Sequence, residues 1–120
     1  NDVDLEAEDN YCIRSICYFG HFPIIEYILE NHKTNVDLAA EDNDCIVSAC
    51  LNGHLPIVKY MLENYKSDVD LGAQDNRCIR WACRNGHLPV VKYHKRNAVS
   101  FMTLYMKLRF IYNIFYENLL

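Results

Sequence analysis

Cysteine and histidine recur in this sequence at a spacing that could serve metal chemistry. The pattern Cys-x4-Cys-x3-His occurs three times, as Cys12, Cys17 and His21, then at 45, 50 and 54, and at 78, 83 and 87. Thiolates and imidazoles are zinc ligands. Two cysteines five residues apart on a helix, however, lie about 140° apart around its axis, because one turn takes about 3.6 residues. They do not converge on one ion, so we predict free structural thiols and no metal.

Disulfides between equivalent cysteines are also unfavourable. Equivalent cysteines of neighbouring units should lie a helix-packing distance apart, about 8–10 Å, whereas a disulfide needs Cα atoms within about 7 Å. The second cysteine of each pattern acts as a small hydrophobic residue. Because six unpaired thiols favour a reducing compartment, we predict an intracellular protein of the cytoplasm or nucleus.

The histidines do not indicate catalysis. No serine or cysteine nucleophile with an orienting carboxylate accompanies His21, His54 or His87 in its unit. We interpret them as polar caps that tie an inter-helix turn to the adjoining loop, and predict neither enzymatic activity nor a cofactor. Trp81, the only tryptophan, has two open interpretations: an anchor for a partner, or a packing residue of the first-helix row.

The elements that position these residues come from a repeated unit. Val3-Asp4-Leu5 recurs as Val36-Asp37-Leu38 and again, after the same interval, as Val69-Asp70-Leu71. More than half of the positions in 3–35 are identical in 36–68, and 36–60 matches 69–93 still more closely. All three prolines fall at one repeat position and all six cysteines at two. A fixed period of this kind indicates units that stack on one another.

The middle unit shows what each unit should form. Cys45–Leu51 followed by Asn52-Gly53 predicts a two-turn helix that ends at a glycine with positive φ. Pro56 begins a second helix, where its missing N–H is harmless. The residues from Asp70 to Asn76 are rich in turn formers and suggest an extended, hairpin-like link. An apolar face with helical spacing lies on the second helix: Ile57, Val58, Met61 and Leu62.

A helix–helix–hairpin unit of about 33 residues resembles the ankyrin repeat. The matching residues are Gly-His at 20–21, 53–54 and 86–87, each followed by an apolar-Pro-aliphatic-aliphatic run. The Thr-Pro-Leu-His signature of that family keeps only its apolar third residue here. Asp75-Asn76 and the run 80–87 resemble instead a divergent subgroup of ankyrin repeats that is common in giant DNA viruses. The resemblance implies an all-α ankyrin-repeat solenoid of helix-turn-helix units joined by hairpin-like loops.

The resemblance also implies where a partner should bind. Functional residues of the family lie at loop tips and on the groove side of the first helices. We therefore predict a non-catalytic scaffold that binds a protein through loop tips and the concave face of the first helices. A Cys/His metal-binding protein and a purely structural segment of a longer array are the alternatives. The predicted partner-binding residues are Asn10, Tyr11, Arg14, Tyr18, Asn43, Asp44, Leu51, Asn76, Arg77, Arg80, Trp81 and Arg84.

Composition sets further bounds. The 120 residues are 51% hydrophobic and 23% charged, which suits one folded domain. A net charge of −4 and a pI of about 5.7 give no reason to expect a nucleic-acid or membrane partner. The chain begins in mid-pattern, so we expect a piece of a longer protein with neighbouring repeats.

The pattern breaks after Tyr93. We place three repeats within 1–97, at about 3–35, 36–68 and 69–97, and a divergent apolar tail at 98–120. The tail is interpreted either as an atypical C-terminal helix that caps the stack or as a frameshifted segment. A membrane helix is disfavoured, because Lys107 and Arg109 interrupt the run and no uncharged stretch approaches the required ~20 residues.

Overall fold

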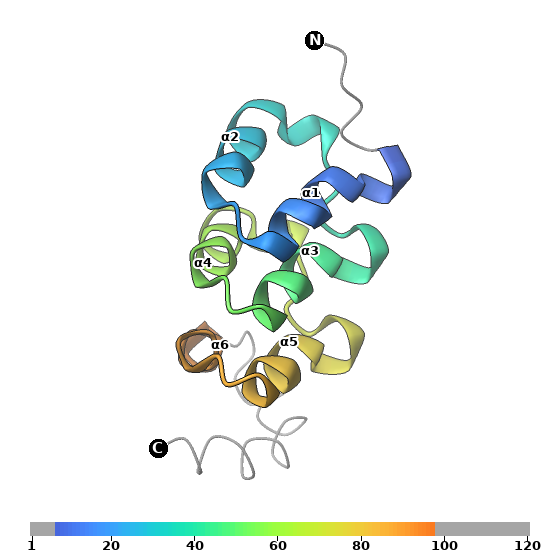
Figure 1. Ribbon diagram of the computed structural model, residues 1–120. Coiled ribbons are helices and arrows are strands. Elements are labelled where there is room, and N and C mark those ends of the chain that lie inside the picture. Colours follow the sequence, from blue (N-terminus) through green and yellow to red (C-terminus); the bar gives the residue numbers. More distant parts are fainter. Residues whose placement is uncertain (1–6, 98–120) are drawn as a thin grey trace.

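The computed structural model describes residues 7–97, and this part of the chain consists of helices and turns (Figure 1). The tail expected over 98–120 lies outside the described residues. In chain order the elements are α1 (Ala7–Phe19), α2 (Phe22–His32), the short 3-10 helix η1 (Lys33–Asn35), α3 (Ala40–Leu51), α4 (Leu55–Asn64), the 3-10 helix η2 (Lys66–Asp68), α5 (Ala73–Arg84) and α6 (Leu88–Asn97).

Three helix pairs stack in two rows, as the repeat predicts. The first helices α1, α3 and α5 pack side by side in one row, and the second helices α2, α4 and α6 form the other (Figure 1). One continuous core joins all three pairs. Because each pair buries its apolar side chains against the next pair, the predicted all-α stacked solenoid is confirmed.

A glycine turn separates the two helices of each pair. Gly20, Gly53 and Gly86 have φ values of +80°, +75° and +76°, the left-handed region that glycine adopts without strain. The next N–H closes the turn over the helix end, as in the 2.8 Å bond from His54 N–H to the Ala49 carbonyl. This six-to-one bond and the positive φ define a Schellman ending. The predicted glycine stop is therefore confirmed.

The second helices bury the face that their periodicity predicts. Pro23 and Pro56 lie in the first turns of α2 and α4. On α4, Ile57, Val58 and Met61 are buried, with Leu62 partly buried beside them. The buried side chains of α2 occupy corresponding positions. Burial of aliphatic side chains contributes most of the stabilisation, roughly 25 cal/mol for each Å² removed from water.

The links between pairs contain the turn formers that the sequence predicts, but their backbone is not extended. Three successive residues, 41–43, have φ values between 52° and 64°, and 74–76 repeat this left-handed turn. Right-handed helix follows at Asp44 and at Arg77. Non-glycine residues in this conformation cost about 1–2 kcal/mol each. Specific contacts must therefore hold these turns.

A histidine interrupts the regular core of the last pair. His94 lies at the repeat position of Met61 and Ile28, both of which are buried. Its side chain is only 2% exposed, and neither ring nitrogen has a hydrogen-bond partner among the described residues. Burial lowers the pKa of His94 to about 4, since the charged imidazolium would lose its hydration. Helix α6 continues through the break in the repeat, but with a polar core residue.

Candidate functional site

Most of the predicted partner-binding residues lie on the exposed side of α1, α3 and α5, which we call the first-helix face. Tyr11, Tyr18 and Arg84 are exposed on it. A second group of predicted residues is half-buried: Arg14, Asp44, Leu51, Asn76, Arg77, Arg80 and Trp81. The repeat brings these residues together because positions 11, 44 and 77, and likewise 18, 51 and 84, are equivalent in successive first helices.

Asn10 and Asn43 instead lie inside the array. Both side chains are buried, and both residues are left-handed with φ of 64°. Each side-chain oxygen accepts a hydrogen bond from the backbone of the next unit. The Asp37 N–H lies 2.8 Å from Asn10 Oδ1, and the Asp70 N–H lies 2.7 Å from Asn43 Oδ1. These two asparagines hold neighbouring units together and offer little surface to a partner.

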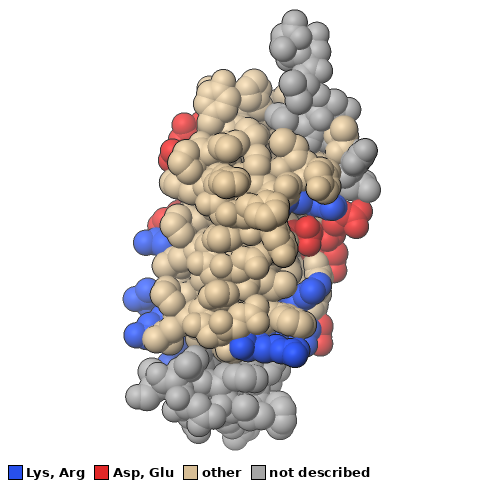
Figure 2. All heavy atoms as spheres, viewed as in Figure 1, with Lys and Arg blue, Asp and Glu red and all other residues tan. Residues whose placement is uncertain are grey.

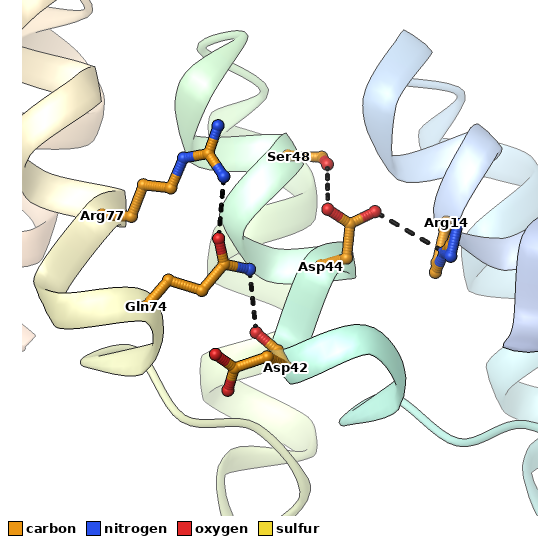
Figure 3. A network of polar contacts seen from close by, with 6 residues as sticks. All are labelled: Arg14, Asp42, Asp44, Ser48, Gln74 and Arg77. Carbon is orange, nitrogen blue, oxygen red and sulfur yellow. Dashed lines mark hydrogen bonds and ion pairs between the residues drawn. The ribbon is translucent and has the colours of Figure 1, made fainter.

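A polar network links α1 to α3. Arg14 Nε lies 3.6 Å from Asp44 Oδ2, and Ser48 Oγ donates to Asp44 Oδ1 at 3.3 Å (Figure 3). The carboxylate of Asp44 is thus held from two sides. A half-exposed ion pair of this kind contributes little to stability, about 0–1 kcal/mol. Its main effect is to fix the direction of the Arg14 and Asp44 side chains.

Gln74 forms the corresponding link between α3 and α5. Its Nε2 donates to the Asp42 carbonyl at 3.0 Å, and its Oε1 accepts from Arg77 Nη1 at 2.8 Å (Figure 3). The Arg77 guanidinium is therefore positioned by a side chain that is itself tied to the preceding unit. Arg80 has another role. It donates to the carbonyls of Asp75 at 2.9 Å and Gln74 at 3.4 Å, and so satisfies the left-handed turn.

Two guanidinium groups lie close to the Trp81 ring. The Cζ atoms of Arg77 and Arg84 are 5.5 and 4.6 Å from the centre of the indole ring. Both distances are within the range of cation–π attraction, about 6 Å. Neither arginine takes part in the two ion pairs found within residues 7–97. This group of Arg77, Trp81 and Arg84, which we call the Trp81 cluster, combines a large apolar ring with two uncompensated positive charges.

The histidines of the second and third Gly-His motifs, His54 and His87, lie against the preceding unit. His54 Nε2 donates to the Tyr18 carbonyl at 2.9 Å, at the end of α1. The ring also occupies the space that a Cβ on Gly20 would need, and His87 lies against Gly53 in the same way. The predicted role as a polar cap bonded to the adjoining loop is therefore wrong for His54, because its side chain makes no cap bond and its partner is the carbonyl at the end of the preceding first helix. In the third unit, Asn85 Nδ2 bonds the equivalent Leu51 carbonyl at 2.9 Å.

The cysteines meet across unit boundaries. Cys17 contacts Cys45, and Cys50 contacts Cys78, so the second cysteine of one unit meets the first cysteine of the next. The hydrogen bond to the partner thiol, together with burial, raises the pKa of Cys17 and of Cys50 well above the usual range. All six cysteines are free thiols. Within residues 7–97 no three His, Cys, Asp or Glu side chains are grouped closely enough to hold a metal ion.

Sequence reasoning missed these cross-unit contacts. The prediction about disulfides concerns equivalent cysteines, such as Cys17 and Cys50, whereas the packed helices bring together cysteines of different repeat positions. The interval from Cys17 to Cys45 recurs from Cys50 to Cys78, and this recurrence was a usable signal. The bridging role of Gln74 had no signal of this kind, because its equivalent in the preceding unit is Glu41.

Charge is distributed along the edges of the stack. Figure 2 shows a central surface that is mostly uncharged, with acidic and basic side chains along its two sides. No helix of the described segment is both long enough and apolar enough to cross a membrane.

Comparison with known proteins identifies the repeat. The family model described as "Ankyrin repeats (3 copies)" matches residues 11–94. Neither the curated proteins nor the solved structures contained a match to the chain. The matched segment covers all six α-helices in whole or in part.

Proposed function

Since the chain belongs to the ankyrin repeat family, whose members are generally protein–protein interaction modules, we propose that it is a non-catalytic scaffold that binds a protein partner through the first-helix face. The Trp81 cluster is the observation that carries this proposal. Tryptophan and arginine are the residue types that most often dominate the energy of protein interfaces. Here Trp81, Arg77 and Arg84 are neighbours on α5, and none of the three side chains is fully buried.

The cluster indicates the chemistry of the partner. Arg77 and Arg84 have no carboxylate partner within residues 7–97, and this favours an acidic partner segment. The charge-assisted hydrogen bonds that arginines form with carboxylates are stronger than neutral ones. The indole offers a flat apolar surface against which an aliphatic or aromatic side chain can pack. Leu51 and Tyr18 continue this surface onto α3 and α1 at the positions equivalent to Arg84. We therefore propose an elongated acidic partner segment with at least one apolar side chain.

Preorganisation supports the same face. The Asp42–Gln74–Arg77 contacts fix one guanidinium, whose Cζ lies 5.5 Å from the centre of the Trp81 ring. Binding to side chains that are already ordered avoids an entropy cost of about 0.5–1.5 kcal/mol for each side chain. The residues that we propose as partner contacts are Tyr11, Arg14, Tyr18, Asp44, Leu51, Asn76, Arg77, Trp81 and Arg84. Asn10, Asn43 and Arg80 are assigned structural roles.

Selection from a random peptide library tests this proposal without a known partner. The immobilised 120-residue chain should enrich peptides that contain Asp or Glu close to an apolar residue. Replacing Arg77 and Arg84 together by Glu should weaken the best peptide at least about tenfold, equivalent to about 1.4 kcal/mol. Lys66→Glu, the same charge reversal on the exposed 3-10 helix η2, is the matched control and should leave affinity within about twofold.

Trp81→Ala separates the two interpretations of the tryptophan. An anchor loses affinity on truncation while the urea midpoint of the chain is little changed. A packing residue lowers the urea midpoint instead. Selected peptides without carboxylates, or an equal loss of affinity from Lys66→Glu, would contradict the proposed face.

We further propose an intracellular location and a relationship to the divergent ankyrin repeats of giant DNA viruses. Support comes from the six free thiols and from the Arg-Trp-Ala-x-x-Asn-Gly-His run at 80–87. In protein isolated from its native source, alkylation under denaturing, non-reducing conditions followed by peptide mass spectrometry should find all six cysteines of residues 1–120 as free thiols. Four or fewer would contradict the intracellular location.

A further inference from the structure

The two asparagine–glycine steps of the chain are chemically alike but lie in different surroundings. Asn52-Gly53 and Asn85-Gly86 follow the first helices α3 and α5, and each step is followed by a histidine. Asparagine before glycine is the sequence most prone to spontaneous deamidation, because glycine has no side chain to hinder attack by its own backbone nitrogen. A difference in reactivity between the two steps in the folded chain must therefore come from the structure.

The backbone geometry of the two turns is nearly the same. Asn52 has φ and ψ of −99° and 6°, and Asn85 has φ and ψ of −87° and 0°. The N–H groups of Gly53 and Gly86 each donate to a carbonyl of the preceding helix at 3.2 Å. Deamidation requires this nitrogen to leave its hydrogen bond and reach the asparagine side chain. Each turn must therefore open locally before it reacts, and the free energy of opening controls the rate.

The ring of His87 covers the first of these turns, and no described residue covers the second in this way. A Cβ built on Gly53 would lie 2.5 Å from His87 Nδ1, and both Asn52 and Gly53 are half-buried. At Gly86 no described residue lies within 4 Å of the same position, and both Asn85 and Gly86 are exposed. Opening of the first turn has to displace a packed ring, a cost for which the described residues give no counterpart at the second turn.

The side chain of Asn85 also lies at the proposed partner face. Its Nδ2 donates to the Leu51 carbonyl of the preceding unit at 2.9 Å. Leu51 and Arg84 occupy equivalent positions of that face, and Asn85 directly follows Arg84. The Asn52 amide instead donates to the Ser48 carbonyl of its own helix at 3.0 Å. Loss of the Asn85 amide therefore changes a contact between units and adds charge at the face.

We propose that Asn85 is a site of spontaneous deamidation, and that the product places a negative charge on the first-helix face. The Gly86 nitrogen attacks Cγ of Asn85, the new N–Cγ bond closes a succinimide ring, and the Cγ–Nδ2 bond breaks. Ammonia leaves with the proton of the Gly86 nitrogen. Water then opens the ring at either carbonyl and gives aspartate or isoaspartate. Water is the only co-reactant, and no group is oxidised or reduced.

Both products remove the donor to the Leu51 carbonyl, because a carboxylate only accepts hydrogen bonds. Isoaspartate also routes the main chain through the side-chain carbon, and the longer backbone no longer fits the turn. The new charge lies next to Arg84 in the chain and opposes an acidic partner segment. This effect on binding rests on the proposed function, whereas the deamidation itself does not depend on it.

Peptide mass spectrometry of the purified 120-residue chain, after incubation in buffer, measures both reactions in one sample. In the folded chain we expect Asn85 to convert at least about tenfold faster than Asn52, because the uncovered turn opens more readily. In urea the two asparagines should convert at rates within about twofold of each other, because unfolding removes the difference in local opening.

His87→Ala tests the role of the ring. It uncovers Gly53 and should raise the rate at Asn52 at least about threefold, because the cost of local opening falls. The rate at Asn85 should change little. A rise at Asn52 alone supports the role of the ring, because general unfolding would raise both rates.

Asn85→Asp carries the charge of the product and tests its effect on binding. It should weaken the best peptide of the library selection by about twofold to fivefold, the range of one exposed charge contact. Ser67→Asp, the same change from a neutral to an acidic side chain on the exposed 3-10 helix η2, is the matched control and should leave the affinity unchanged.

Two outcomes would overturn the proposed site. In the first, Asn52 converts as fast as Asn85 in the folded chain. In the second, Asn85 converts only after urea is added. An unchanged peptide affinity of Asn85→Asp would refute the effect on binding. A library that yields no acidic peptide would count against the proposed function and leave the site of deamidation standing.

Discussion

Substitution of Asn43 gives the sharpest test of how successive units are joined. Its side chain performs two functions that different replacements can separate. The oxygen accepts the Asp70 N–H at 2.7 Å, and the backbone adopts φ of 64°. Asp keeps the acceptor and tolerates the conformation. Gly keeps only the conformation, and Ala keeps neither.

The expected magnitudes follow from these roles. Loss of the acceptor leaves a part-buried N–H unsatisfied, which costs about 1–3 kcal/mol, with the lower half expected because Asp70 itself is exposed. Alanine in the left-handed region has a Cβ and no side-chain polar contact, and this adds about 1–2 kcal/mol to the loss of stability. We therefore expect Asn43→Asp to be nearly neutral, Asn43→Gly to lose about 1–2 kcal/mol and Asn43→Ala about 2–4 kcal/mol.

Urea unfolding followed by far-UV circular dichroism measures these differences. The denaturant slope m should stay constant across the series, because the same surface is exposed on unfolding. If Ala and Gly gave equal losses, the strain of the left-handed turn would carry no weight. If all three variants matched the parent chain, the bond between Asn43 and the next unit would not contribute to stability.

Three further predictions concern other contacts between and within units. His94→Met should stabilise the chain and reduce its loss of stability in acid. The pKa of His94 is about 4 in the folded chain and about 6.5 in the unfolded chain, so the free energy of unfolding falls as pH drops from 6.5 toward 4. The expected loss is up to about 3 kcal/mol. Urea titrations at several pH values measure it. Gly53→Ala should cost more than Gly86→Ala in thermal unfolding. Both have positive φ, but only at Gly53 does a described residue, His87, occupy the added Cβ site. In native alkylation Cys12 should react first, and Cys17, Cys45, Cys50 and Cys78 should react only on unfolding, since they are fully buried.

The fold could be predicted from the sequence because the residues that end the helices and form their apolar faces recur in each unit. Gly53 and Pro56 fixed the ends of two helices, and the spacing of Ile57, Val58 and Met61 fixed the buried face. The left-handed turns at 41–43 and 74–76 could not be foreseen. Turn-forming residues indicate that the chain bends, but not which allowed region the backbone occupies, and here contacts with the next unit decide.

The candidate site was predictable only by position. Equivalent residues of the first helices had to share a face, and Tyr18, Leu51 and Arg84 do so. Asn10 and Asn43 were assigned to a partner because the family uses its loop tips, yet their oxygens are occupied within the array. Arg80 was grouped with Arg84, but it satisfies two backbone carbonyls. These assignments depend on contacts between units, which a comparison of aligned repeats does not contain.

The thiol contacts have a consequence for how such a gene can change. Each of the two observed boundaries joins the second cysteine of one unit to the first cysteine of the next, so a unit presents the same pair of complementary ends wherever it stands. Duplication or deletion of a whole module by unequal crossing-over therefore recreates a matched boundary. The number of units can therefore vary without further mutations that restore packing at the boundary. The exposed residues remain free to change.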